Sequence, residues 1–193
     1  MLLLERPAGE VLHTQLTLEE YLALPEDSRY EIVDGLLRPM TRSGKRNRTV
    51  QRRLANRLEQ QAPQDLFVVE EEIVIFKAAP PSTRIPDVTV CRAEAIVDPD
   101  SNSIAVADVL LVAEIVSPGS ETDDRYHKPG DYARNGVPHF WRIELDPAVE
   151  VFTYHLENGV YREAGGFRRG DRIADSSLPW VDIDVTGLLV PFA

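Results

Sequence analysis

Cysteine is almost absent from the sequence, and so are long apolar runs. Cys91 is the single cysteine among 193 residues, which excludes an internal disulfide framework and leaves no disulfide partner within the chain. The opening MLLLERPAGE has too short an apolar run for a secretory signal peptide, and no stretch approaches the length of a membrane span. We therefore expect a cytoplasmic protein without a membrane segment.

Aromatic residues are also scarce, at 7% of the chain, and positive charge is in the minority. A hydrolase that uses paired carboxylates on a glycoside needs an aromatic platform for its sugar, so the scarcity disfavours that class of enzyme. The formal net charge of −11 disfavours non-specific binding to nucleic acid when it is taken as a sum over the whole chain.

Basic residues are nevertheless concentrated in one segment that contains no acidic residue: Lys45, Arg46, Arg48, Arg52, Arg53 and Arg57. Two interpretations stay open for this segment. It is either the solvated face of a helix or a patch that holds a nucleic-acid backbone. In the second case Arg48 and Arg52, which point away from the apolar stripe of the expected helix, contact phosphates.

Three segments have helical patterns. The capping box at residues 17–20 predicts a short helix that ends near Pro25. Residues 46–61 carry apolar side chains at helical spacing and predict the clearest helix. Residues 128–135 predict a third helix, with a proline suited to its first position and Gly136 suited to the position after its end.

Strand patterns outnumber helical ones. The expected strands and hairpins are YEIVDGLLRPM around Asp34-Gly35, LFVVEEEIVIF as one long strand, RIPDVTVCR, the buried strand VLLVAEIV, HFWRIEL with VEVFTYHL as a hairpin, and LPWVDIDV; AAPPST and residues 98–103 are expected to be loops. Hairpins and crossovers together predict a mixed sheet, hence an α/β or α+β fold. Residues 1–15 are expected to form an N-terminal arm and residues 16–193 a single domain.

Four ionisable residues stand out by their setting. Glu31 lies in an apolar strand, Asp87 follows a proline within another, and Glu114 lies near the end of the most apolar strand. Lys128 follows Glu114 by a turn. Two carboxylates that meet at strand ends repel each other unless a cation lies between them, and hard oxygen ligands favour magnesium or manganese. Structural roles stay open: Glu31 could pair with an arginine, and Asp87 could close a turn.

The order of these residues resembles the PD-(D/E)XK nuclease superfamily, and more closely the Uma-two family of restriction endonucleases. The matching segments are YEIVDGLL, IPDVTV, LLVAEIVSPGSETDDRYHKPGDYARNGVPHFWRIELDP and VEVFTYHLENGVY, within residues 17–161. The superfamily places its lysine two residues after the strand acid, where this chain has Val116. The resemblance implies that Lys128, from the following helix, takes that role.

The resemblance also implies the fold and the activity. It implies a restriction-endonuclease-like core, a mixed central sheet flanked by helices and extended by C-terminal hairpins. It implies a magnesium- or manganese-dependent endonuclease that hydrolyses DNA. Asp87 and Glu114 would hold the metal, with Glu31 and Lys128 as further catalytic residues. Because cutting both strands needs two sites, we expect a homodimer.

One position departs from the family pattern. The family often has a histidine early in its long helix, where this chain has Asn47. Asparagine can hydrogen-bond a water or a phosphate, so Asn47 is a candidate nucleic-acid contact, but it cannot act as a general base. This keeps a second function open, a catalytically inactive binding or assembly module on a nuclease fold.

Overall fold

The computed structural model describes residues 12–25, 28–41, 43–96 and 101–188. Its central sheet has six strands in the order β12-β11-β10-β9-β7-β4. Their bounds, in that order, are Val160–Arg168, Glu150–Glu157, His139–Glu144, Val109–Ile115, Val88–Arg92 and Leu66–Glu70. Strands β9 and β10 pair in parallel and every other neighbouring pair is antiparallel. The expected mixed sheet is therefore confirmed.

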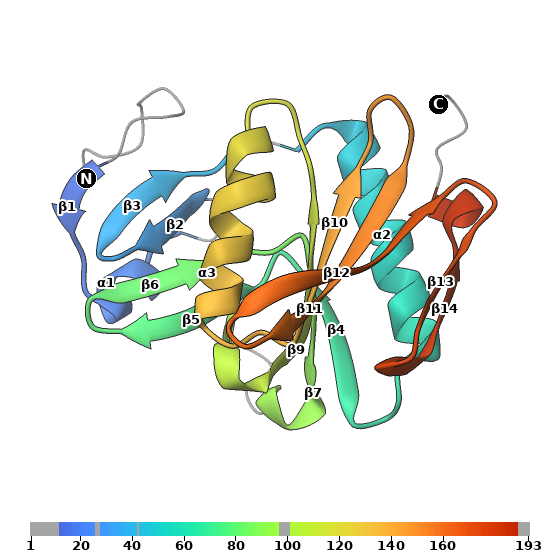
Figure 1. The fold of residues 1–193 in the computed structure, drawn as a ribbon. Coiled ribbons are helices and arrows are strands. Elements are labelled where there is room, and N and C mark those ends of the chain that lie inside the picture. The colour runs from blue at the N-terminus through green and yellow to red at the C-terminus, as the bar shows by residue number, and fades with distance from the viewer. Residues whose placement is uncertain (1–11, 26–27, 42, 97–100, 189–193) are drawn as a thin grey trace.

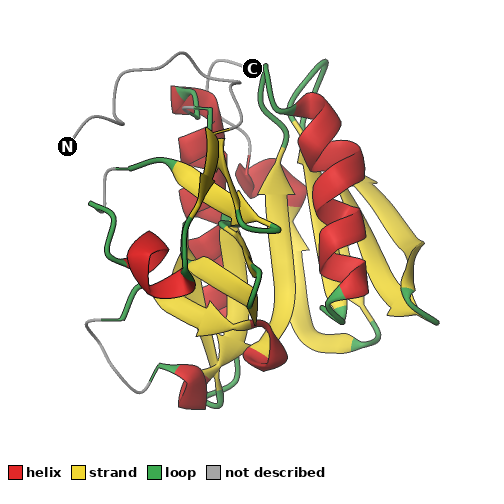
Figure 2. Cartoon of the chain, turned by 90° about the vertical axis from the view of Figure 1, so that its left-hand side faces the viewer, coloured by secondary structure: helices red, strands yellow, loops and turns green. Residues whose placement is uncertain are grey.

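One helix covers each face of this sheet (Figures 1 and 2). Helix α2 (Lys45–Gln61) lies on one face, where Leu54 and Leu58 pack against the buried side chains of β9 and β10. Helix α3 (Lys128–Arg134) lies on the other face, where Tyr132 packs against Val112 and its neighbours. Alternate residues of β9 thus face different helices, and Glu114 faces α3 together with Val112.

The connection from β9 to β10 explains why these two strands are parallel. After β9 the chain passes through a π-helical turn (Asp123–His127) that leads directly into α3, and it then returns to begin β10. A crossover of this kind is what parallel neighbours require. Gly136 ends the crossover helix with a positive φ of 79°, as its place in the sequence predicted.

Two smaller sheets flank the N-terminal half. The first, β1-β3-β2, combines Leu12–Gln15, Leu36–Pro39 and Tyr30–Val33. Its hairpin turns at Asp34-Gly35, where both φ angles are positive, as expected. Helix α1 (Leu18–Leu22) begins with the predicted capping box. Residues 12–15, expected in the arm, therefore pair with β3; residues 1–11 lie outside the described residues.

The second small sheet corrects two sequence-based predictions. The segment predicted as one long strand is two strands in different sheets, β4 and β5 (Ile73–Ala78), because the chain turns at Glu71, whose φ is positive. The segment AAPPST is not all loop, since Pro81–Arg84 forms β6 beside β5. Strand β8 (Ser103–Ala105) completes this sheet, and residues 97–100 of the predicted loop lie outside the described residues.

The C-terminal part adds a separate hairpin, β13 (Arg172–Asp175) and β14 (Leu178–Asp184), which packs against the α2 side of the core (Figure 1). The predicted β10–β11 hairpin is present, in register from His139↔His155 to Glu144↔Glu150. No helix in the described part of the chain is long and apolar enough to cross a membrane.

Candidate active site

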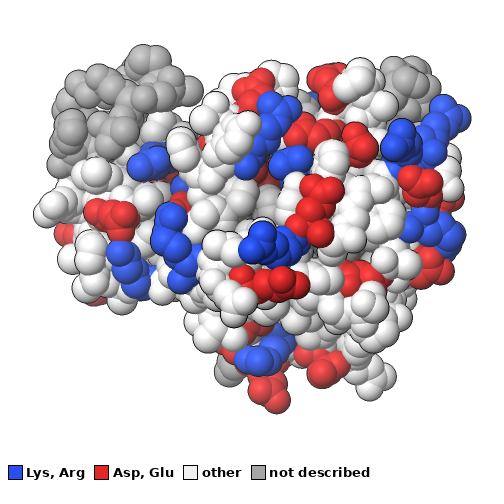
Figure 3. All heavy atoms as spheres, viewed as in Figure 1, with Lys and Arg blue, Asp and Glu red and all other residues white. Residues whose placement is uncertain are grey.

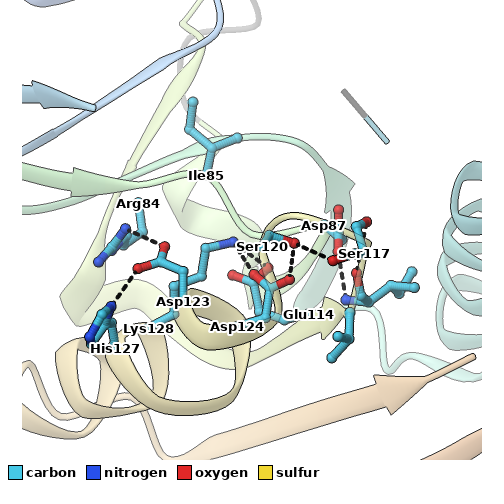
Figure 4. Close-up of polar contacts among 12 residues, drawn as sticks. Arg84, Ile85, Asp87, Glu114, Ser117, Ser120, Asp123, Asp124, His127 and Lys128 are labelled. Atoms are coloured by element: carbon cyan, nitrogen blue, oxygen red, sulfur yellow. Dashed lines mark hydrogen bonds and ion pairs between the residues drawn. The ribbon is translucent and has the colours of Figure 1, made fainter. Parts of the chain in front are cut away.

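A cavity of about 240 Å³ opens at the carboxyl end of β9. All four residues singled out by the sequence, Glu31, Asp87, Glu114 and Lys128, line it. They come from β2, from the residue before β7, from β9 and from the start of α3. Residues more than ninety positions apart in the chain therefore meet at one place, and Figure 4 shows Asp87, Glu114 and Lys128 around it.

Glu114 is the most buried member of the group, with 1% of its surface exposed. Its Oε2 lies 2.7 Å from the Lys128 ammonium, and its Oε1 accepts a hydrogen bond of 2.5 Å from the Tyr132 hydroxyl. Burial raises the pKa of the Glu114 carboxyl well above its usual value, although Lys128 opposes this. The apolar strand can carry this carboxylate because two residues of α3, Lys128 and Tyr132, contact it.

Lys128 reaches the cavity from the first turn of α3. Its Nζ lies between two acids, 2.7 Å from Glu114 Oε2 and 2.9 Å from Asp124 Oδ1. Burial disfavours the ammonium, but the surrounding carboxylates outweigh this and raise the pKa of Lys128 well above its usual value. A charged amine is therefore fixed beside the strand acid even though the lysine comes from a different element (Figure 4).

Asp87 lies across the cavity, immediately before β7. Its Oδ2 accepts a hydrogen bond of 2.6 Å from the Ile115 amide on the neighbouring strand. Burial raises the pKa of the Asp87 carboxyl to about 6, against the opposing effects of Lys128 and of this hydrogen bond. The hydrogen bond occupies Oδ2, and Oδ1 has none within the described residues.

Glu31 is held by a buried arginine. Its Oε2 lies 2.5 Å from the Arg84 guanidinium, and its Oε1 accepts from the Ile85 amide at 2.9 Å. Arg84, 1% exposed, also pairs with Asp123 at 3.1 Å and with Asp131 at 2.5 Å. The geometry matches the arginine-paired alternative for Glu31, so this carboxylate borders the cavity with both oxygens already engaged.

Asn47, Arg48 and Arg52 are not among the residues that line the cavity. Asn47 is buried, and its amide donates to Ser117 Oγ at 2.6 Å and to the Val116 carbonyl at 3.1 Å. These hydrogen bonds connect the first turn of α2 to the segment that directly follows β9. Arg48 and Arg52 are exposed on α2, and Arg48 donates to the carbonyl of Ser43 on the cavity rim.

Sequence reasoning did not assign a role to several residues that hold the site together. Asp124 pairs with Lys128 and accepts a hydrogen bond of 2.5 Å from Ser120 Oγ. Arg84 forms ion pairs with three acidic side chains. The spacing of Asp124, Lys128 and Tyr132, four residues each, was a usable signal, because such residues share one helix face. Arg84 gave no local signal, since its partners lie on three other segments.

The donor set suits a hard divalent cation. Five carboxylates line the cavity, and three of them, those of Asp87, Glu114 and Asp124, are not paired with Arg84. The Lys128 ammonium touches two of these three, Glu114 and Asp124. Burial raises the pKa values of Asp87 and Glu114 even though Lys128 lowers both, so the partners present offset the burial of the two carboxylates only in part. Carboxylate oxygens with unmet negative charge are the ligands that Mg²⁺ and Mn²⁺ prefer.

A mixed sheet between two helices, with an acid at the end of its central strand, defines the restriction-endonuclease-like class of fold. A crystal structure from Anabaena variabilis, described as "a putative nuclease belonging to DUF820", shares this fold with a TM-score of 0.68. The alignment covers 90% of this chain and 97% of that one at 18% sequence identity. At that identity the likeness establishes the fold.

The chain belongs to the Uma2 family, whose description is "Putative restriction endonuclease" and whose family model matches residues 18–186. The family resemblance seen in the sequence is thereby confirmed. No curated protein matches the chain in sequence.

Proposed function

We propose that the protein is a metal-dependent endonuclease that hydrolyses phosphodiester bonds in DNA. The observation that carries the proposal is the meeting of Asp87, Glu114 and Lys128 at one cavity, with the lysine delivered from α3. Membership of the family supports the nuclease class, and the lysine position fits the displaced arrangement that the family resemblance implies.

Asp87 and Glu114 would hold Mg²⁺ or Mn²⁺, and Asp124 adds a third carboxylate beside them. A bound ion of this kind supplies Lewis-acid polarisation of the phosphate and a water of lowered pKa. Glu31 holds Arg84 and the Ile85 backbone in place at the edge of the cavity. Both of its oxygens are engaged in these contacts, so it does not offer a free oxygen to the metal.

Lys128 has two tasks in this proposal. Its ammonium favours the ionised form of Glu114, and the N–H that is not engaged by Glu114 or Asp124 can donate to the charge that develops on the phosphoryl oxygens. Because burial and the pair with Glu114 fix its position before substrate arrives, little reorganisation is needed at the moment of reaction.

The assignment is tested by incubating the purified protein with supercoiled and linear DNA in Mg²⁺ or Mn²⁺, with a chelator in parallel. We expect cleavage with either metal and none with the chelator. Wild type that binds DNA without cutting it under any of these conditions would instead support the inactive binding module, which Asn47 in place of the family's usual histidine keeps open.

Replacing Lys128 with Met should lower the rate of cleavage by about 100-fold or more, the usual cost of one lost donor to a developing oxyanion. Metal affinity should stay the same or increase, because Met removes a competing cation from beside Glu114 and Asp124. Single-turnover kinetics and a calorimetric Mg²⁺ titration separate the two effects. Equal losses in both would make Lys128 a structural residue.

DNA binding should be weak, because only two basic residues, Arg38 and Lys128, line the cavity among the described residues. It should decrease with salt in proportion to the number of phosphates contacted. On the α3 face, basic and acidic side chains alternate and form no single-sign surface among the described residues (Figure 3). Replacing Arg48 and Arg52 together with Ala should weaken binding to all sequences alike and reduce the salt slope by about 2.

The matched control for that experiment is the pair Arg92 and Arg162, which are exposed and lie at the opposite end of the central sheet. Their double replacement should leave the slope of binding against salt unchanged. If the control pair changes the slope and the Arg48–Arg52 pair does not, the DNA-contact surface lies elsewhere.

We also propose a homodimer, because cleavage of both strands requires two copies of this one cavity. Sedimentation equilibrium with and without a two-strand DNA substrate tests this. A strict monomer in both conditions would contradict the proposed homodimer.

A further inference from the structure

Two histidines and an aspartate meet at the other end of the central sheet from the carboxylate cavity. His139 begins β10 and lies directly opposite His155 on β11, while Asp175 ends β13. One potential ligand atom from each residue lies within 4.8 Å of the other two. His139 is level with Leu111 in the sheet register, whereas the cavity lies beyond Glu114, so the two clusters are separate.

The cluster is mostly buried and open on one side. His139 is 7% and Asp175 is 9% exposed, while the His155 side chain is 26% exposed. The two imidazole rings stand at 88° to each other with centroids 5.1 Å apart. Solvent therefore reaches the cluster past His155 and not past the other two side chains.

One buried nitrogen in this cluster lacks a hydrogen-bond partner. Nδ1 of His139 is buried and has no hydrogen-bond partner among the described residues. Buried polar atoms without a partner are uncommon and require an explanation, such as an ion or a water. His155 Nε2, by contrast, lies 2.6 Å from Asp175 Oδ2, and Ser177 Oγ donates to Asp175 Oδ1 at 2.6 Å.

We propose that His139, His155 and Asp175 form a second metal site, which takes a first-row transition ion such as Zn²⁺ with a water in the fourth position. Imidazole nitrogen with one carboxylate is a ligand set typical of zinc and disfavours magnesium. Zinc–ligand bonds of about 2.0–2.1 Å put tetrahedral ligand atoms roughly 3.3 Å apart. The present spacing within 4.8 Å therefore needs only small side-chain movements to close around an ion.

The placement of the ligands indicates what the ion does. His139 and His155 belong to the central sheet, and Asp175 belongs to the separate β13–β14 hairpin. An ion held by all three would tie that hairpin to the sheet, and its binding free energy would add to the stability of the folded state. This effect on stability is independent of DNA cleavage, so its test is separate from that of the nuclease.

The experiment is a titration of metal-free protein with Co²⁺, followed by the visible d–d absorption, and with Zn²⁺, followed by the melting temperature. We expect one Co²⁺ per chain with the intense bands of four- or five-coordination. Zn²⁺ in hundredfold excess over Kd should raise Tm by roughly 5–10 °C. Mg²⁺ is kept in large excess throughout to reduce binding of Co²⁺ and Zn²⁺ at the carboxylate cavity, and the Asp87→Asn variant reports what remains of that binding.

Four variants make the result specific. His155→Gln and Asp175→Asn should each lose the cobalt bands and the zinc shift, and the partly exposed position of His155 makes its variant the safer one for folding. Asp87→Asn, in the other cavity, should keep both signals. His127→Gln is the matched control, an exposed histidine that already pairs with an aspartate. Absent cobalt bands in the wild type, or bands that persist in His155→Gln, would overturn the proposal.

Discussion

Replacing Asp87 with Asn should abolish the proposed DNA cleavage and should leave the metal-free protein at least as stable as the wild type near neutral pH. Cleavage should be lost because the amide supplies no negative charge to a divalent cation. Stability is kept because Asn can still accept the hydrogen bond from the Ile115 amide. Burial already penalises the ionised form of Asp87, as its pKa of about 6 indicates. Removing that charge relieves the penalty.

The sign of the pH dependence follows from the same shift. The folded-state pKa of Asp87 is raised from 3.8 to about 6, so the folded state holds its proton more tightly than the unfolded state. Ionisation of Asp87 therefore does not affect the free energy of unfolding below about pH 4. As pH rises from about 4 to about 6, it lowers the stability of the metal-free protein. The total loss is up to about 3 kcal/mol. The stability difference between variant and wild type should widen over this window and stay constant above it.

Thermal melts at several pH values, with and without magnesium, measure both effects. Magnesium at a hundredfold excess over Kd should stabilise the wild type by about 2.7 kcal/mol and leave the variant unchanged. The matched control is Asp65→Asn, an exposed aspartate outside the cavity, which should alter neither cleavage nor the magnesium response. A variant that melts far below a magnesium-indifferent wild type would make Asp87 a structural residue and remove the central ligand from the proposal.

Glu31 and Glu114 could be singled out from the sequence because each is a charged residue within an otherwise apolar strand. A carboxylate inside an apolar strand is costly unless something compensates it, so Glu31 and Glu114 were visible without any tertiary information. The sequence could not assign the compensating partner. Glu31 pairs with Arg84, which the sequence predicted as the first residue of the strand RIPDVTVCR but which ends β6 in the structure. The pairing depends on β6 lying next to β2.

Asn47 illustrates the opposite case. Its position on the apolar stripe of α2 was apparent, but its polar side chain suggested contact with nucleic acid. In the structure it donates to the end of β9 and is buried there. A polar residue on an apolar face can either line a site or satisfy backbone carbonyls, and only the packing of α2 against β9 distinguishes the two. Its expected contact with nucleic acid stays a prediction.

The largest loss of stability should come from Arg84, which the sequence did not single out. Replacing it with Met leaves Glu31, Asp123 and Asp131 without their shared cation, and Glu31 is 3% exposed. Removing one partner from a buried ion pair costs about 3–5 kcal/mol, because the remaining charge is neither solvated nor paired. Arg84→Lys should recover only part of this, since an ammonium cannot reproduce the fork of a guanidinium.

Urea unfolding of the two variants measures the loss, and Arg92→Met is the matched control. Arg92 is 62% exposed in its side chain and pairs with Asp108 at 3.5 Å, so its replacement should cost less than about 1 kcal/mol. The double variant Arg84→Met with Glu31→Gln should lose less than the sum of the two single losses, because the amide leaves no buried charge at residue 31. Additive losses, or a loss from Arg84→Met no larger than that from Arg92→Met, would show that the cluster contributes no more than a surface pair. Glu31 would then be free to serve the metal directly.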